Sequence, residues 1–367
     1  MRKLNVKNEP VKHRYLAWLE EAQGRDRKTA DMAAAAIHVF EQSTGFRDFK
    51  NFHREQAVKF KRDLRDAVNP KTKKPLAKAT IYSRLKAVQK FFSWLADQPG
   101  YKSRLHRPDL EYFNITDNEG RMAKASRERP FPSVDQVRQV VLSSPSGSPI
   151  EKRDRALIAF TLLTGARISA LASLQLQHLD IESRCVFQDA RDVRTKHRKT
   201  FPTFFFPMGE ELIRIVAEWV DYLQDVERFG PCDPLFPATK NDLNDKGFFE
   251  ASGLAREHWK QSGSIRDIFR SRFKAAGLPY FNPHSLRKTI MQEAYKRKLD
   301  LEALKAWSQN LGHEDTKTTI DSYGPVSRHR QAEILAGQST TSEAPGSETP
   351  SPEEIRRVLD HLKQNAS

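Results

Sequence analysis

Apolar residues recur at helical spacing in several stretches of the first third of the chain. The clearest pattern covers residues 77–97, and its apolar positions, three or four residues apart, are Ile81, Leu85, Val88, Phe92 and Leu95. Because an α-helix turns once every 3.6 residues, these side chains form one buried stripe. Weaker helical patterns cover residues 11–22, 27–42 and 53–68. We therefore predict a small helical domain over residues 1–118.

The periodic pattern is lost between residues 112 and 132, where the sequence becomes polar and charged. Two prolines stand at the end of this segment. Directly afterwards, Ser133 and Gln136 have the spacing of a capping box that opens a helix. We therefore predict a linker at residues 119–132 and a second domain over residues 133–337.

In the second domain, helical patterns alternate with two short strand-like runs. An apolar helix is predicted around residues 151–163, and Gly165 after it permits a tight junction with the next helix. Residues 185–187 and 200–206 have the composition of strands, and a helix is predicted at residues 209–225. This alternation predicts helices packed around a small sheet.

The rest of this domain gives weaker signals. We interpret residues 242–253 as a loop. Residues 269–274 interleave basic and aromatic side chains, which suits a DNA contact and an amphipathic helix equally well. An apolar stripe over residues 301–307 predicts a helix that ends at Gly312.

Charge is distributed unevenly along the chain. The net charge is +15 and the pI about 9.7, and residues 1–129 carry 29 Lys and Arg against 16 Asp and Glu, whereas the remainder carries 33 against 31. A basic first third indicates a polyanionic partner such as DNA, with an ordinary solvated surface as the alternative. The residues predicted to contact DNA lie in a basic loop and on the helix that follows it: Lys73, Lys74, Lys78, Arg84, Lys86 and Lys90.

Composition argues against several other classes of protein. The sequence has no long apolar run and no signal peptide, so we expect no membrane partner. Cys185 and Cys232 are far apart and lack the spacing of metal ligands, which fits a cytoplasmic protein without disulfides. We expect no cofactor and no metal, because the sequence has no acidic cluster suited to Mg²⁺.

Groups suited to phosphate chemistry gather between residues 283 and 323. His284, Arg287 and His313 can bind phosphate oxygens, because arginine keeps its charge and imidazole titrates near neutral pH. Tyr323 is a potential nucleophile that needs activation, since the pKa of a free phenol is about 10. Each residue alone has an ordinary structural explanation, but their order in one chain indicates a site.

This order resembles the tyrosine recombinase (phage integrase) family. The second box of the family reads His-x-Leu-Arg, as His284 to Arg287 do, and its end reads Leu-Gly-His, a Thr-Thr pair and Tyr, as residues 311–323 do. The first box, Thr-Gly-x-Arg-x-Ser, is matched by residues 164–169 and adds Arg167 to the predicted site.

Besides a tolerated change at Lys288, where the family often has His, the match to the family departs in two places. Ala170 stands where the family usually has a Glu that supports the active site by hydrogen bonding. The interval from His313 to Tyr323 is one residue longer than usual. The first departure puts the supporting hydrogen bonds in question and leaves the phosphate-binding set in place.

The family also uses a lysine on a β-hairpin as the general acid for the leaving 5′ oxygen. Here Thr195 and Lys196 resemble the Thr-Lys turn of the family, whereas Lys199 lies nearer the usual distance before Pro207. We favour Lys196, and the variable length of such hairpins leaves Lys199 open.

The resemblance implies a mainly α protein, with a helical core-binding (SAM-like) domain and an α+β catalytic domain that contains a small sheet. It implies that Tyr323 attacks a DNA phosphate, forms a 3′-phosphotyrosyl link and frees a 5′-hydroxyl, while the arginines and histidines stabilise the charge. The implied partners are double-stranded DNA and a homo-tetramer on two DNA sites, with room for an accessory DNA-bending or directionality factor. The implied role is recombination of a mobile element.

Two other functions fit the same residues. One is a catalytically silent DNA-binding protein of this fold, and the other is a type IB-like topoisomerase. For the end of the chain, residues 338–350 predict a flexible linker. The cap at Ser351 and the apolar stripe of Ile355, Val358, Leu359 and Leu362 then predict a short amphipathic helix. We expect that helix to pack on its own domain, to fray, or to dock on a neighbouring protomer.

Overall fold

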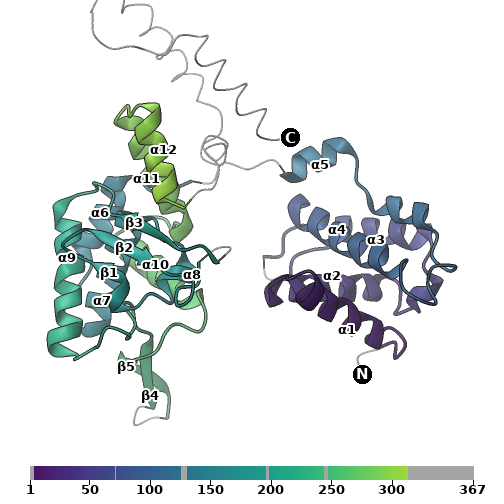
Figure 1. The fold of residues 1–367 in the computed structure, drawn as a ribbon, viewed down its shortest axis with the longest axis horizontal. Coiled ribbons are helices and arrows are strands. Elements are labelled where there is room, and N and C mark those ends of the chain that lie inside the picture. The colour runs from purple at the N-terminus through teal and green to yellow at the C-terminus, as the bar shows by residue number, and fades with distance from the viewer. Residues whose placement is uncertain (1–3, 71, 125–129, 196–197, 244–246, 313–367) are drawn as a thin grey trace, which may run out of the picture. The chain divides into compact units, whose positions relative to one another are not determined.

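The chain forms two compact units, residues 1–127 and residues 128–367. Helices dominate both units, and the second unit adds a small antiparallel sheet, so the predicted fold class is confirmed. The parts of the chain that the computed structural model describes, drawn in colour in Figure 1, are residues 4–70, 72–124, 130–195, 198–243 and 247–312.

Helices make up the first unit. Its elements are α1 (Glu9–Ala17), η1 (Trp18–Ala22), α2 (Arg27–Ser43), η2 (Phe49–Asn51), α3 (Arg54–Asp66), α4 (Lys78–Leu95), η3 (Arg107–Phe113) and α5 (Asp117–Lys124). The four helical patterns of the sequence correspond to α1 with η1, α2, α3 and α4. Their periodic apolar positions were sufficient to locate them.

Aromatic rings fill the centre of the first unit. Phe92 on α4 stacks on Phe52 with ring centroids 4.2 Å apart, and Phe40 on α2 meets Phe92 edge-on at 5.1 Å. Phe113 stacks on Phe52 from η3 at 5.5 Å. All four side chains are at most 5% exposed. Each such burial contributes roughly 1.5–3 kcal/mol, so this cluster is a main source of stability for the unit.

A buried carboxylate ties α1 to α2. Glu41 is fully buried and accepts hydrogen bonds from Nδ2 of Asn8 at 3.0 Å and from Nζ of Lys12 at 2.8 Å. Burial opposes the charge of Lys12, but its hydrogen bonds with Glu41 and Glu9 outweigh burial and raise the pKa of the ammonium group. The carboxylate is therefore compensated rather than left isolated.

Helix α5 occupies the beginning of the stretch predicted to be a linker. The backbone N–H of Glu119 donates to Oγ1 of Thr116, and the N–H of Thr116 donates to Oε2 of Glu119, both at 3.3 Å. Arg65 on α3 donates to Glu119 at 2.8 Å, and α5 also packs against α4. A helix this short and polar has no apolar stripe for the sequence pattern to reveal.

Helices also dominate the second unit, which contains a three-stranded and a two-stranded sheet. Its elements are α6 (Val134–Ser143), α7 (Pro149–Thr164), α8 (Ile168–Leu171), η4 (Leu176–His178), β1 (Leu179–Asp180), β2 (Cys185–Gln188), β3 (Phe201–Phe204), α9 (Glu210–Asp221), η6 (Tyr222–Val226), β4 (Thr239–Leu243), β5 (Phe249–Leu254), α10 (Gly263–Ala275), η7 (Pro283–Ser285), α11 (Leu286–Lys296) and α12 (Leu301–Asn310).

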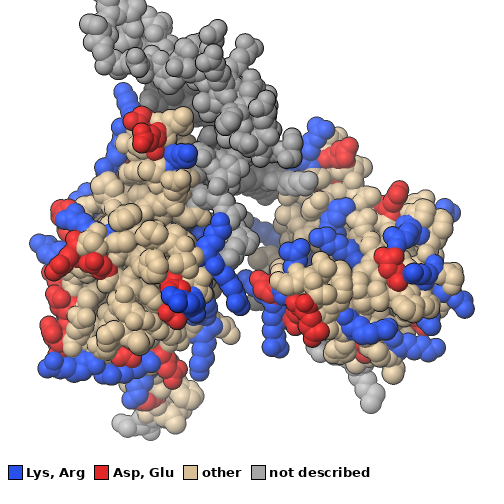
Figure 2. Space-filling view, viewed as in Figure 1, with Lys and Arg blue, Asp and Glu red and all other residues tan. Residues whose placement is uncertain are grey.

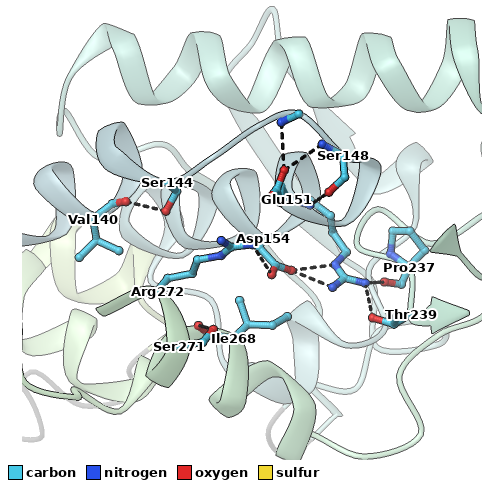
Figure 3. A network of polar contacts seen from close by, with 12 residues as sticks. Val140, Ser144, Ser148, Glu151, Asp154, Pro237, Thr239, Ile268, Ser271 and Arg272 are labelled. Carbon is cyan, nitrogen blue, oxygen red and sulfur yellow. Dashed lines mark hydrogen bonds and ion pairs between the residues drawn. The ribbon is translucent and has the colours of Figure 1, made fainter. Parts of the chain in front are cut away.

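Helix α7 is the centre of the second unit, and its residues from Ala156 to Thr164 are all buried. Helices α6, α9 and α11 pack against it. A capping box of Ser148 and Glu151 begins α7 (Figure 3), and the predicted box of Ser133 and Gln136 begins α6. A helix that is apolar on every side must lie inside a domain, and this burial fixes its C-terminal end close to the site described below.

The predicted strand-like runs form an antiparallel sheet of order β1-β2-β3. In it, Val186 pairs with Leu179 on one side and with Thr203 on the other. The loop between β2 and β3 spans residues 189–200, the segment that contains the predicted lysines.

The prediction of a loop at residues 242–253 was wrong. This stretch lies within the antiparallel hairpin of β4 and β5, in which Leu243 pairs with Phe249 and which projects from the second unit in Figure 1. Leu243 is 64% exposed and Phe249 is 78% exposed. Because neither face of the hairpin is buried, its sequence lacks the apolar alternation that marks a strand.

A network of charged residues joins the base of this hairpin to α7 and α10. Asp154 accepts hydrogen bonds from Nη2 of Arg153 at 2.7 Å and from Nη2 of Arg272 at 3.1 Å (Figure 3). Arg153 also donates to the carbonyl of Pro237 and to Oγ1 of Thr239. Burial lowers the pKa of Arg153, and Asp154 counteracts this shift.

The structure also distinguishes between the two interpretations of residues 269–274. They belong to α10, with Phe269 and Phe273 fully buried and Arg272 turned towards Asp154. The amphipathic-helix interpretation is therefore confirmed for this segment, and a DNA contact by its exposed basic residues stays a prediction.

Within the described residues, no helix combines the length and the apolar character needed to cross a membrane.

Candidate functional site

Gly165 brings the segments of the site together. It caps α7 in the left-handed conformation, with φ of 61°. A Cβ atom here would lie 2.4 Å from Cδ2 of Leu311, closer than real Cβ atoms come, and 3.0 Å from Cδ1 of Ile290, which is a tight contact. Only glycine therefore lets the first box lie directly against α11 and the end of α12.

Arg287 ties the same three segments together by hydrogen bonds. It is the second residue of α11 and is 7% exposed. Its Nη1 donates to the carbonyl of Gly165 at 2.8 Å, and its Nη2 donates to the carbonyl of Leu311 at 2.7 Å. One guanidinium group thus holds together the first box, the second box and the segment that leads to His313.

Arg167 lies two residues after that junction, as the N-cap of α8. Its side chain is half-buried, and burial lowers the pKa of its guanidinium group. Among the residues that the structure describes, none offers the guanidinium group of Arg167 a hydrogen bond or an ion pair. A partly desolvated cation without a partner is costly in a folded protein, and an anionic ligand compensates it.

His284 lies in the 3₁₀ turn η7 that leads into α11, and its side chain is exposed. Its backbone N–H donates to Oδ1 of Asn282 at 3.0 Å, and this cap fixes the turn. The imidazole is therefore presented at the surface three positions before Arg287.

The segment expected to provide the lysine is the loop between β2 and β3. Lys199 is exposed in it, whereas Lys196 lies outside the described residues. The choice between them stays open.

Two predicted site residues, His313 and Tyr323, also lie outside the described residues, as does the tail at 338–367. The structure does describe the chain up to Gly312, directly before His313. Gly312 has φ of 67°, and a Cβ atom on it would lie 2.7 Å from the ring of Phe201 on β3. The chain therefore enters the last motif against the sheet, in a conformation that favours glycine.

Asn310 is a residue that sequence reasoning missed. Its Oδ1 accepts from the backbone N–H of Phe204 at 2.7 Å, and its Nδ2 donates to the carbonyl of Phe204 at 2.8 Å. The side-chain amide thus pairs with the edge of β3 as a neighbouring strand would. No local pattern in the sequence marks this contact, because the two residues are 106 positions apart.

Ala170, where the resemblance departs, is buried in α8 at 1% exposure. Because this position lies on the buried side of α8, the departure removes a carboxylate that would lie inside the domain rather than at its surface. The neighbouring Ser173 is 4% exposed and donates to the carbonyl of Ser169 at 3.1 Å.

The predicted DNA contacts of the first unit differ in their surroundings. Lys73, Lys74, Lys78 and Lys90 are exposed, and Arg84 and Lys86 are partly buried. Lys86 donates to Oε1 of Gln89 at 2.8 Å and to Oδ1 of Asn114 at 2.9 Å, so it joins α4 to the end of η3. Figure 2 shows basic side chains spread over the visible face of each unit, with acidic ones between them.

Comparison with known proteins places these features in a family. The tyrosine recombinase XerC of Lactobacillus delbrueckii subsp. bulgaricus is 24% identical over 316 residues, covering 84% of this chain and 92% of the relative. XerC of Escherichia coli O1:K1 / APEC is 26% identical over 254 residues, covering 67% of this chain and 70% of the relative.

Solved structures share the fold. The XerH recombinase bound to a palindromic difH substrate in a post-cleavage complex has a TM-score of 0.60 at 16% identity, covering 87% of this chain and 82% of that one. A lambda integrase dimer bound to a COC′ core site has a TM-score of 0.58 at 14% identity, covering 87% and 96%. The sequence model of the phage integrase family matches residues 133–330. With this match over more than half of its length, the chain belongs to the phage integrase family of tyrosine recombinases.

Proposed function

We propose that this protein is a site-specific DNA recombinase of a mobile element, which cuts and rejoins DNA through a 3′-phosphotyrosyl intermediate. The observation that carries the proposal is Arg167, a half-buried guanidinium group without a partner among the described residues, beside a junction held by Arg287. A DNA phosphate is the anion that suits this position, because guanidinium pairs with phosphate oxygens through two parallel hydrogen bonds.

In the proposed reaction, Oη of Tyr323 attacks the phosphorus of the scissile phosphate, and a neutral imidazole of the site accepts the phenol proton. The bond from phosphorus to the 5′ oxygen breaks, and the ammonium group of Lys196 or Lys199 protonates that oxygen. Arg167 and Arg287, with His284 and His313, stabilise the charge on the non-bridging oxygens. The phosphotyrosine bond conserves the energy of the broken phosphodiester bond. A different 5′-hydroxyl can therefore attack the phosphotyrosine and rejoin the strand without ATP.

The proposed partner is double-stranded DNA. Relatives of this fold have been solved on DNA, and the first third of the chain has a large excess of basic residues. Exchange between two sites requires two cleaved duplexes in one assembly, so we infer a homo-tetramer on two DNA sites, acting in the cytoplasm. An accessory DNA-bending or directionality factor would select the direction of exchange.

The decisive experiment uses a nicked suicide substrate, from which the short 5′-hydroxyl strand diffuses away after cleavage. Wild-type protein should accumulate a covalent adduct with DNA, and Tyr323→Phe should bind the same DNA without forming it. Adduct in the Tyr323→Phe variant would remove Tyr323 from the role. Absence of adduct in the wild type would favour the silent DNA-binding protein.

A second assay separates the recombinase from a type IB-like topoisomerase. Two duplex sites and wild-type protein should yield a Holliday junction, which strand exchange between duplexes produces. Relaxation of supercoils without any junction would favour the topoisomerase.

A further inference from the structure

The loop between β2 and β3, residues 189–200, carries both lysines proposed as the general acid, Lys196 and Lys199. A general acid acts only within hydrogen-bond reach of the oxygen that it protonates. The contacts that fix this loop therefore control the step in which the 5′ oxygen leaves.

Arg194 binds this loop to the body of the second unit. Its backbone N–H donates to Oγ of Ser173 at 2.8 Å, and its Nη2 donates to the carbonyl oxygens of Ala172 at 2.8 Å and Trp259 at 2.7 Å. The three acceptor residues are buried, at 1% for Ala172, 4% for Ser173 and 6% for Trp259. Although Arg194 itself is exposed, its hydrogen-bond acceptors belong to the buried core.

These contacts join the loop to the helix that begins at Arg167. Helix α8 spans four residues, so its N-cap Arg167 and its C-cap Ala172 are separated by a single short helix. A further hydrogen bond joins the two ends of the loop, since the backbone N–H of Ala190 donates to Oγ1 of Thr200 at 3.0 Å. The described part of the loop around Arg194 is thus tied to the helix that begins at the arginine proposed to hold the phosphate.

We propose that Arg194 is a positioning residue, which holds the β2–β3 loop on the end of α8 so that a lysine of the loop delivers its proton to the departing 5′ oxygen. This inference rests on the proposed function. In the step concerned, the bond between phosphorus and the 5′ oxygen breaks, the oxygen keeps the bonding electron pair and takes the ammonium proton, and lysine becomes a neutral amine.

An exposed arginine in a DNA-binding protein has a second explanation, which is direct contact with a DNA phosphate. Loss of a phosphate contact weakens binding and reduces its salt dependence. Loss of a positioning contact leaves binding unchanged and slows bond breaking, but only where the leaving group needs a proton. One variant therefore distinguishes the two explanations.

The experiment compares Arg194→Ala with wild type in single-turnover cleavage at saturating protein, on two DNA substrates. In one the bridging 5′ atom is oxygen, and in the other it is sulfur, which leaves without a proton because a thiol has a pKa of about 8.5. We expect Arg194→Ala to slow cleavage of the oxygen substrate by about 10- to 100-fold and that of the sulfur substrate by less than about twofold.

Arg256 provides a matched control. It is also exposed on the second unit, and its Nη2 also donates to two carbonyl oxygens, those of Glu227 at 2.7 Å and Arg228 at 2.9 Å. Arg256→Ala removes the same charge and the same kind of carbonyl contact, together with an ion pair to Asp233 and a contact with the ring of Phe229, and should cleave both substrates at the wild-type rate. Ser173→Ala removes the acceptor of the Arg194 N–H without a change of charge, and should reproduce the Arg194→Ala pattern with a smaller loss.

Equal slowing of Arg194→Ala on both substrates would overturn the inference. Normal cleavage at saturation, combined with weaker and less salt-dependent DNA binding, would also overturn it, in favour of a phosphate contact. If wild-type protein forms no adduct on either substrate, the proposed function itself fails. The two failures are therefore distinguishable.

Discussion

At the scale of single residues, the two arginines of the site have different surroundings. Arg287 is nearly fully buried and donates to the carbonyl oxygens of Gly165 and Leu311. Arg167 is half-buried and has no partner among the described residues. The first arginine therefore belongs to the folded structure as well as to the proposed site, whereas the second would gain its partner only from the proposed DNA phosphate.

This difference gives a prediction for Arg167→Ala and Arg287→Ala. Both should slow DNA cleavage by about 10²–10³-fold, the usual cost of one transition-state donor. Only Arg287→Ala should also lower the free energy of unfolding, because it leaves two buried carbonyls without donors. Urea denaturation beside single-turnover cleavage checks both parts. A change in cleavage of only a few-fold would remove that arginine from the site.

Gly165 gives a second prediction at this scale. Gly165→Ala combines an unfavourable positive φ with a Cβ atom 2.4 Å from Leu311. We expect a loss of roughly 2–4 kcal/mol in the free energy of unfolding, from backbone strain and overpacking together. Gly277→Ala is the control, since Gly277 has φ of 72° but nothing within 4 Å of its Cβ position. Equal losses in urea denaturation of the two variants would contradict the predicted contact.

At the scale of elements, local patterns were predictable and contacts across the sheet were not. Helix α4 and the capping box of Ser133 depend on neighbours within a few positions, and the sequence revealed both. The motif order likewise indicated Arg167 and Arg287, which the structure brings to one junction through Gly165. The hairpin of β4 and β5 was missed because both of its faces are exposed.

The long-range hydrogen bonds near the site were missed for a different physical reason. Arg194 binds Trp259, which is 65 positions away, and Asn310 binds Phe204, which is 106 positions away. In the sequence an Arg or Asn of this kind cannot be told from an ordinary surface residue. Its role exists only once the fold has placed its partner.

Asn310 therefore gives a prediction at the scale of an element. Asn310→Ala removes both hydrogen bonds to the backbone of Phe204, which are near the surface, and should lower the free energy of unfolding by about 1 kcal/mol. Hydrogen exchange should show faster exchange at the Phe204 amide, because this N–H loses its acceptor. Unchanged protection at Phe204 would show that the amide does not hold the strand edge in solution.

The ion pair between α1 and α2 gives a prediction of pH dependence. The pKa of Lys12 is raised in the folded state, so its stabilising effect is complete below the unfolded pKa of about 10.5 and is lost as pH rises through the folded value. Lys12→Met leaves Glu41 buried without its cation and should cost roughly 2–3 kcal/mol at pH 7. The difference between wild type and variant in urea denaturation should shrink above pH 10.5. A difference independent of pH would exclude the ion pair as its cause.

At the scale of the whole molecule, chemistry and charge are divided along the chain. The matched family region and the arginine junction belong to the second unit. The excess of positive charge belongs to residues 1–129, with 29 basic against 16 acidic residues. Since phosphate neutralisation gives affinity without sequence information, the proposed function assigns the holding of DNA to the first part of the chain and the reaction to the second.

This division gives a prediction about salt. The variant replaces with glutamine the four exposed lysines of the basic loop and α4: Lys73, Lys74, Lys78 and Lys90. If each neutralises one phosphate, the slope of log K against log salt should fall by about 0.9 per lysine, or about 3–4 in total. Lys86 is left unchanged, because its ammonium group already serves Gln89 and Asn114.

The matched control has the same change in net charge, so it separates local contacts from the overall field of the protein. It replaces four exposed lysines on other segments of the first unit: Lys7, Lys28, Lys50 and Lys102. If α4 and its preceding loop face the phosphates, binding titrations between low and high salt should show the large change in slope only for the first variant. Equal changes in both would mean that net charge, rather than this surface, attracts DNA. Cleavage at saturating DNA should stay at the wild-type rate in both, because the altered lysines belong to the unit that lacks the arginine junction.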